Sequence, residues 1–200
     1  MAGLTGIFGG TFDPPHLGHI TLAQSGIEEF GLDKVLWVLT HNPPHKPDDP
    51  ITPLEPRRMM LQTAIMGLPN FELSRIDIDR PAPHYATGTM RALREANPDV
   101  HYLYLMGEDS LRDLPTWHNP AEFVDLCDML GVMHRSSIQV DLDALEDILP
   151  GIGAKVRFSS AQQVDISATD IRRRVHEGLP FEHLVPHQVA HIIRDLELYM

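Results

Sequence analysis

The chain has 200 residues, of which 42% are hydrophobic and 22% are charged, and its formal net charge is −12. That length and composition are typical of one globular domain with a buried core, and no apolar run approaches the ~20 residues needed to cross a membrane. The acidic charge argues against broad binding to nucleic acid or to an anionic membrane, although a small anionic substrate depends only on the local field.

The first half of the chain alternates expected strands and helices. Residues 4–8 predict a strand, and after a glycine-rich loop a helix places four apolar residues on one face, at the 3.6-residue period: Ile20, Ala23, Ile27 and Phe30. Residues 35–39 are continuously apolar, as in a parallel strand buried on both faces. A proline-rich loop over 41–56 precedes a helix with the apolar face Leu61, Ala64, Ile65 and Leu68. Alternation over 75–79 predicts a further short strand.

The second half continues the alternation. It predicts a helix over 87–95, strands over 102–106, 129–133 and 155–158, and closing helices over 169–177 and 186–198. We therefore expect an α/β fold: one Rossmann-like, doubly wound domain over residues 1–200 with a mostly parallel sheet and right-handed crossovers. Its C-terminal part, about 165–200, is expected to be helical and packed on the sheet. Ligands of such sheets bind at the carboxyl ends of the strands.

An eleven-residue segment after the first strand carries the strongest chemical signal: Gly9-Gly10-Thr11-Phe12-Asp13-Pro14-Pro15-His16-Leu17-Gly18-His19. The glycines let backbone N–H groups approach a phosphate, and the helix that follows points its positive end at the same place. No Lys follows as in a P-loop, and the spacing does not fit the dinucleotide fingerprint Gly-x-Gly-x-x-Gly. Phosphate contact is the favoured interpretation; a plain tight turn, a metal site and a solvated surface are the alternatives.

Three further loops follow predicted strands. His41-Asn42-Pro43-Pro44-His45-Lys46 is stiffened by prolines and offers Lys46 as a mobile charge for phosphate, or as a merely exposed lysine. Asp109, in Gly107-Glu108-Asp109, is suited to a ribose hydroxyl or hydrated Mg²⁺, and equally to capping a helix. Trp117, next to His118, is suited to stacking on a planar ring or to simple packing.

The segment Ile166-Ser167-Ala168-Thr169-Asp170-Ile171-Arg172 contains a Ser-x-x-Asp capping signature. Capping accounts for Ser167 and Asp170 but not for Arg172, because a cation in the first helical turn opposes the helix dipole. An anion shared by Arg172 and the free N–H groups would reconcile the two. We expect at most one arginine of the run 172–174 to be functional.

Together these segments resemble the nucleotidyltransferases with a His-x-Gly-His motif, and more narrowly the bacterial nicotinate-nucleotide adenylyltransferases. The resemblance rests on 9–19, Asn42–Lys46, Tyr85 with Thr89, 107–109, 115–117 and 166–172, which occur in the family's order over nearly the whole chain. Two departures are visible: Tyr85-Ala86 stands where the family often has Tyr-Thr, and Trp117-His118 replaces a Trp-Tyr pair.

The resemblance implies the nucleotidylyl transferase fold and transfer of the adenylyl group of ATP to nicotinate mononucleotide, with catalytic contacts from His16, His19, Lys46 and Arg172. It implies an ATP site formed by Gly9, Gly10, Thr11, Phe12, His16, His19, Gly107, Asp109, Ile166, Ser167 and Arg172. It implies a mononucleotide site formed by Asn42, Lys46, Tyr85, Thr89, Asp109, Trp117 and His118. Mg²⁺ would be held mainly by substrate phosphates and water, without a protein cage.

Two alternatives stay open: the same fold with nicotinamide mononucleotide or phosphopantetheine as the acceptor, and a nucleotide-binding sensor without turnover. The expected partners are small molecules, with no nucleic acid or membrane. The single cysteine, Cys127, excludes an internal disulfide, and residues 1–4 resemble no signal peptide, so a cytoplasmic location is expected. Nothing in the sequence indicates the oligomeric state.

Overall fold

The computed structural model describes residues 3–41, 51–134, 140–162, 164 and 166–200. Within them, six strands form one sheet in the order β3-β2-β1-β4-β5-β6, and every neighbouring pair is parallel. The strands are β1 Leu4–Gly10, β2 Lys34–Leu39, β3 Phe71–Ser74, β4 His101–Gly107, β5 Met129–His134 and β6 Val156–Gln162. This is the doubly wound order with a switch point between β1 and β4, where a ligand crevice is expected.

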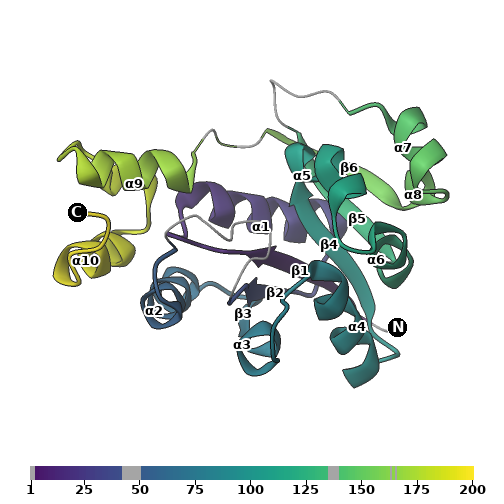
Figure 1. Ribbon diagram of the computed structural model, residues 1–200, viewed down its shortest axis with the longest axis horizontal. Helices are drawn as coiled ribbons and strands as arrows, with labels where there is room; N and C mark the ends of the chain where they lie inside the picture. Colours follow the sequence, from purple (N-terminus) through teal and green to yellow (C-terminus); the bar gives the residue numbers. More distant parts are fainter. Residues whose placement is uncertain (1–2, 42–50, 135–139, 163, 165) are drawn as a thin grey trace.

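Helices cover both faces of the sheet (Figure 1). They are α1 Leu17–Phe30, α2 Leu54–Ile65, α3 Ile76–Asp79, α4 Ala86–Ala96, α5 Glu108–Asp113, α6 Pro120–Leu126, α7 Leu142–Ile148, α8 Ile152–Lys155, α9 Ala168–His176 and α10 His187–Asp195, with 3₁₀ turns at Leu114–Thr116 and Glu182–Leu184. One apolar cluster joins the sheet to α1 and α2, and another joins it to α4, α6, α7 and α8. No helix in these described segments is long and apolar enough to span a bilayer.

The predicted α/β class and the five longer strands are confirmed, with boundaries that differ by a few residues. The strand predicted over 75–79 is wrong, because β3 ends at Ser74 and α3 occupies Ile76–Asp79. The alternating Ile76 and Ile78 are compatible with either period over so short a segment. The helical turn brings the Arg75 guanidinium to within 2.6 Å of the Asp79 carboxylate, four residues on, which an extended strand would hold apart.

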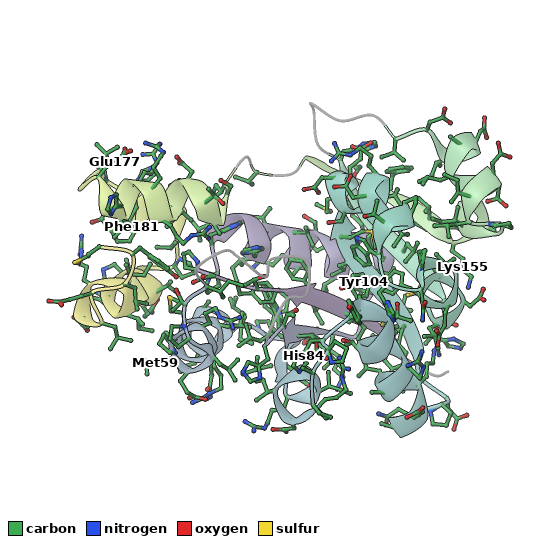
Figure 2. The ribbon with its side chains drawn as sticks, in the orientation of Figure 1. Met59, His84, Tyr104, Lys155, Glu177 and Phe181 are labelled. Atoms are coloured by element: carbon green, nitrogen blue, oxygen red, sulfur yellow. The ribbon has the colours of Figure 1, made fainter. Side chains whose placement is uncertain are left out.

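The two C-terminal helices pack on α2 (Figure 2). Met60 and Ala64 of α2 share a buried cluster with residues of α9, α10 and their connection: Ile171, Phe181, Val185, Val189, Ala190 and Ile193. This cluster contains no strand residue, because α9 and α10 each bury a narrow apolar stripe that one helix can cover. The expectation that residues 165–200 pack on the sheet stays a prediction.

Cys127 lies at the end of α6 and is 1% exposed. Burial raises the pKa of its thiol to about 12, so the thiol stays protonated at neutral pH. It is a core residue, as the sequence predicts.

Candidate active site

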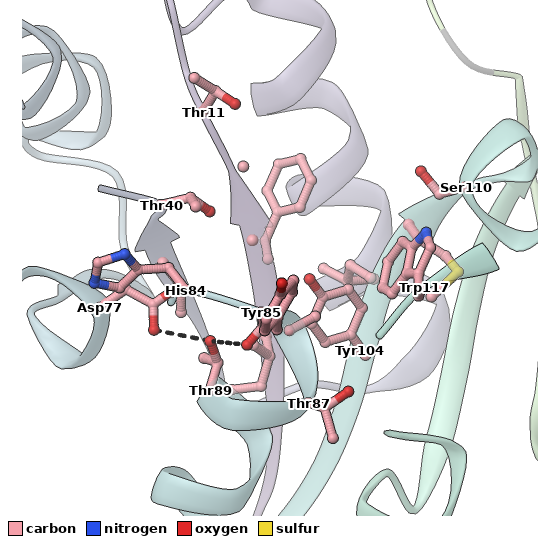
Figure 3. Close-up of a pocket in the computed structure, with 18 of the residues that line it drawn as sticks. Thr11, Thr40, Asp77, His84, Tyr85, Thr87, Thr89, Tyr104, Ser110 and Trp117 are labelled. Carbon is pink, nitrogen blue, oxygen red and sulfur yellow. Dashed lines mark hydrogen bonds between the residues drawn. The ribbon is translucent and has the colours of Figure 1, made fainter. Parts of the chain in front are cut away.

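A cavity of about 560 Å³ opens at the carboxyl ends of β1 and β4, at the switch point of the sheet (Figure 3). It is bordered by the loop after β1, by the start of α4, and by the segment from α5 to His118. Nine residues predicted for substrate contact line it: Gly9, Gly10, Thr11, Tyr85, Thr89, Gly107, Asp109, Trp117 and His118. The topology thus brings residues that are 100 positions apart in the sequence to one opening.

Gly9 lies where the cavity wall has no room for a side chain. A Cβ atom built there would lie 2.5 Å from the hydroxyl oxygen of Tyr104, on the neighbouring strand β4. Tyr104 is buried, and burial raises the pKa of its phenol far above the ordinary value. The glycine therefore permits close approach of a fixed, uncharged phenol.

His16 and His19 lie side by side at the start of α1. His16 precedes the helix, and its backbone N–H donates to Nδ1 of His19 at 3.1 Å. The two rings stack with centroids 3.5 Å apart, and the ring of His19 also packs on Phe8 and Phe12. The two imidazoles therefore occupy the positive end of α1, beside the loop that leads from β1.

Burial, with a smaller contribution from the neighbouring His16 ring, holds the pKa of His19 well below its ordinary value of 6.5. The free site is therefore neutral at His19 near pH 7. Because Nδ1 of His19 accepts from the His16 N–H, the neutral ring carries its proton on Nε2, and that N–H can donate to a phosphate at the helix start.

Arg57 on α2 joins two loops, the one after β1 and the one between β2 and α2, through backbone carbonyls. It is 1% exposed and donates to the carbonyl oxygens of Thr11, Thr40, His41 and Thr52 at 2.7–3.0 Å. The loops after β1 and β2 are thereby held at a set distance from one another. Such a planar fork of donors is a property of arginine that lysine lacks.

Asp13 is a second junction in the loop after β1. Its carboxylate accepts from the Thr52 backbone N–H at 3.1 Å and from the Tyr199 hydroxyl at 2.6 Å. Its carbonyl oxygen accepts from Nη1 of Arg172 at 2.8 Å. The phosphate-binding loop is therefore connected to α9 and to the C-terminal segment.

The three arginines at the start of α9 have different partners. Arg172 faces the loop after β1, whereas Arg173 and Arg174 pair with Asp170, and Arg173 also pairs with Glu177. Ser167 caps the helix by accepting from the Asp170 backbone N–H at 3.1 Å. Capping, as expected, accounts for Ser167, and Arg172 is the member of the run that reaches the loop after β1, while its role toward ATP stays a prediction.

The opposite end of the cavity is aromatic. The half-buried Trp117 packs edgewise near Tyr104 and Phe123, with ring centroids 6.3 Å and 5.2 Å away. Tyr85 stacks on His118 with centroids 4.1 Å apart. Planar groups on both sides suit a flat heterocycle.

The family is decided by comparison with known proteins. A cytidylyltransferase-like family model matches residues 7–174. The probable nicotinate-nucleotide adenylyltransferase of Thermomicrobium roseum is 43% identical over 194 residues, which are 97% of this chain and 90% of the relative. Its counterpart in Dehalococcoides mccartyi strain CBDB1 is 40% identical over 196 residues, 98% and 96% of the two chains. The chain belongs to this adenylyltransferase family.

A solved structure shares the fold. The Plasmodium falciparum nicotinic acid mononucleotide adenylyltransferase complexed with NaAD superposes with a TM-score of 0.82, covering 98% of this chain and 97% of that one. The sequence identity is 16%, so this likeness supports the architecture of the adenylyltransferase domain alone.

Not every predicted site residue of this family member borders the cavity. Phe12, His16, His19, Ile166, Ser167 and Arg172 are described but do not line it. They lie at the starts of α1 and α9 and in the loop after β1. Asn42 and Lys46 lie outside the described residues.

The hydroxyl of Thr89 is already engaged. It donates to Oδ1 of Asp77 at 2.8 Å, and the same carboxylate oxygen accepts from Nη2 of Arg80 at 3.0 Å. Asp77 is 2% exposed, so its hydrogen bond with Thr89 is shielded from water and fixes α3 against α4 beside the cavity (Figure 3). Sequence reasoning places Thr89 in the mononucleotide site, and Thr89 does line the cavity, but through a hydroxyl committed to Asp77.

Several residues that line the cavity or hold its loops are not predicted from the sequence: Asp77, His84 and Tyr104 line it, and Arg57 and Tyr199 bond to the loop after β1. One signal was available for Arg57, because it precedes Leu61 by four residues and Ala64 by seven, on the apolar face of α2. A charged residue at such a position calls for a buried partner. The others have no comparable pattern.

Proposed function

We propose that the protein transfers the adenylyl group of ATP to nicotinate mononucleotide, forming nicotinate adenine dinucleotide (deamido-NAD) and pyrophosphate. The observation that carries the proposal is the composition of one cavity. Its wall begins with the Gly9–Thr11 backbone, which leads to the paired histidines of α1, and it ends at Trp117. The proteins named above, whose names state this activity, give independent support.

The reaction does not require a general base to generate the nucleophile. A phosphate oxygen of the mononucleotide attacks the α-phosphorus of ATP, a new P–O bond forms, the bond to the β-phosphate bridging oxygen breaks, and pyrophosphate leaves. Because the nucleophile is already an anion, positioning and stabilisation of negative charge supply the catalysis.

Magnitudes rank the contributions of the chain. A helix dipole contributes ~0.3–1 kcal/mol, whereas a hydrogen bond to a charged group contributes ~1.5–3 kcal/mol. His16, His19 and Arg172 therefore outweigh the helix end on which the histidines stand. In this proposal they contact the ATP phosphates together with Lys46, and Ser167, Ile166, Phe12 and Gly107 complete the ATP pocket.

The mononucleotide occupies the cavity between β1 and α4. Trp117 stacks on the pyridine ring, Tyr85 and His118 border it, and Asp109 accepts from a ribose hydroxyl. Asn42 and Lys46 act on the phosphate side. A preference for the acid over the amide depends on N–H donors of the backbone near Ala86 and His118.

Mg²⁺ accompanies ATP in this proposal. Among residues 3–41, 51–134, 140–162, 164 and 166–200, no three His, Cys, Asp or Glu side chains gather closely enough to hold a metal ion. A cation whose main ligands are phosphate oxygens and water needs no such cluster of side chains, and Asp109 lies within the same cavity. When bound, Mg²⁺ neutralises charge on the phosphates of ATP.

The test is an assay with Mg-ATP and either nicotinate or nicotinamide mononucleotide, in which dinucleotide and pyrophosphate are both quantified. Equimolar products with a strong preference for the acid are expected. Comparable rates with both acceptors would remove the acid specificity. No product with either, despite ATP binding, would favour a sensor.

A further inference from the structure

His84 is a buried histidine that the proposed reaction has not yet used. It immediately precedes Tyr85 and α4, is 4% exposed, and lines the cavity (Figure 3). Its Nε2 lies 3.0 Å from the carbonyl oxygen of Arg80. Among the described residues, its Nδ1 has no hydrogen-bond partner.

The hydrogen bond to Arg80 decides which nitrogen is committed. A carbonyl oxygen only accepts, so Nε2 must carry a proton and Nδ1 is the atom left for a ligand. A buried polar atom without a partner destabilises the free protein, and a ligand that engages the atom removes that penalty. The Arg80 carbonyl also fixes the ring, since Arg80 itself is held by Asp77 and by the Pro83 carbonyl.

The position of His84 indicates which end of the bound mononucleotide lies next to its ring. In Figure 3 the His84 ring lies on the side of Thr40, across the cavity from Trp117. The ring of His41, which follows β2, lies 5.5 Å from the ring of His84. This end is polar and adjoins the loops that Arg57 joins, whereas the Trp117 end is aromatic.

The reaction requires the acceptor phosphate to point toward the triphosphate, and therefore toward the Gly9–Thr11 loop and away from Trp117. We infer that Nδ1 of His84 donates a hydrogen bond to the phosphate of the acceptor mononucleotide and so positions it for attack. This inference rests on the proposed function and deepens it. The imidazole is protonated on both nitrogens when the phosphate is bound, and the second proton comes from solvent.

A matched pair of variants distinguishes the roles of Nδ1 and Nε2 of His84. In His84→Gln a side-chain amide reaches the position of Nε2 and leaves nothing at Nδ1, whereas His84→Asn places its amide near Nδ1 and abandons the Arg80 carbonyl. We expect His84→Gln to raise the Kd and KM of nicotinate mononucleotide about tenfold, which corresponds to about 1.4 kcal/mol. His84→Asn should stay within about threefold of the parent, and the KM of ATP should change in neither variant.

The control ligand is nicotinate riboside, which lacks the phosphate. Its Kd, measured by calorimetry, should be the same for the parent and for both variants. An unchanged KM of the mononucleotide in His84→Gln would overturn the inference, as would an equal weakening of riboside and mononucleotide. A parent that turns over neither pyridine mononucleotide would instead overturn the proposed function.

A second measurement does not depend on the folding of the variants. In the ¹⁵N-labelled parent, the Nδ1 resonance of His84 should move to its protonated position when the mononucleotide is added, and should not move with the riboside. The same response to both ligands, or to neither, would overturn the phosphate contact.

Discussion

The hydroxyl of Tyr199 donates a 2.6 Å hydrogen bond to Oδ1 of Asp13, across 186 positions of the sequence. The carboxylate raises the pKa of the phenol, in addition to the larger effect of burial, so the phenol stays protonated near neutral pH. The same carboxylate holds Thr52, and the Asp13 carbonyl holds Arg172. The C-terminal segment is therefore part of the support of the phosphate loop.

Tyr199→Phe removes this hydrogen bond and little else. Because the acceptor is charged, the free energy of unfolding should fall by about 1.5–3 kcal/mol. The KM of ATP should rise several-fold, since the loop before α1 loses one support. Urea unfolding and initial-rate kinetics measure the two effects.

Tyr102→Phe is the matched control, because the Tyr102 hydroxyl donates to the neutral Leu93 carbonyl at 3.2 Å and does not line the cavity. It should cost about 0.5–1.5 kcal/mol and leave the KM of ATP unchanged. Equal KM values in Tyr199→Phe and the parent would show that Tyr199 contributes to stability alone.

Arg57→Lys tests the junction of the two loops. A lysine ammonium cannot reach carbonyls spread from Thr11 to Thr52, so some buried acceptors lose their donor. Stability should fall by about 3 kcal/mol, and kcat/KM should fall at least tenfold for both substrates. Arg58→Lys on the same helix is the control, because Arg58 pairs with Glu55 at the surface. A normal kcat/KM in Arg57→Lys would refute the positioning role.

The parts of this fold that sequence predicts are those dictated by local pattern. Continuous apolar runs identified strands such as β2 and β4, and the Ser167 cap located the start of α9. The sequence predicts a strand where α3 lies, because four residues do not distinguish a period of 2 from one of 3.6.

Candidate site residues can be predicted where the relevant side chains lie in one segment, and not where they meet only through tertiary contacts. The segment Gly9–His19 indicates a phosphate site from sequence alone, since glycine and histidine at a strand-to-helix junction have few structural uses. Tyr199, by contrast, meets Asp13 only after the chain has folded. His84 is similar, because its free nitrogen follows from a hydrogen bond to Arg80 that no spacing reveals.

Arg172→Ala and Arg173→Ala distinguish a cation in the site from one on the surface. Arg172 donates to the Asp13 carbonyl, whereas Arg173 bonds to Asp170 and Glu177. The first variant should raise the KM of ATP at least tenfold, and the second should stay within twofold, because exposed ion pairs contribute little. Steady-state kinetics at saturating acceptor measure both, and similar values for the two would contradict the assignment of Arg172.

The lowered pKa of His19 gives stability a pH dependence with a definite sign. In the unfolded chain His19 titrates near 6.5, and in the folded chain it titrates lower. Between the two pKa values the unfolded state binds a proton that the folded state does not, so stability falls as the pH drops through this window. Above pH 6.5 the effect is absent.

His19→Gln removes this titration. The stability advantage of the parent over this variant, measured by urea unfolding without ligand, should be smaller at pH 5.5 than at pH 8. A parent advantage that grows on acidification would mean that the folded state favours the protonated ring.

The close approach of Gly9 to Tyr104 predicts that Tyr104→Phe suppresses the destabilisation caused by Gly9→Ala. In Gly9→Ala the new Cβ atom meets the phenol oxygen at 2.5 Å, and overpacking of this kind costs about 1–3 kcal/mol. In Gly9→Ala/Tyr104→Phe that oxygen is gone, and the nearest remaining ring atom lies at 3.5 Å, an ordinary contact. The double variant should therefore unfold with nearly the free energy of Tyr104→Phe alone. If the two costs simply added, the clash would not be the cause, and the need for glycine would lie in the backbone of the phosphate loop instead.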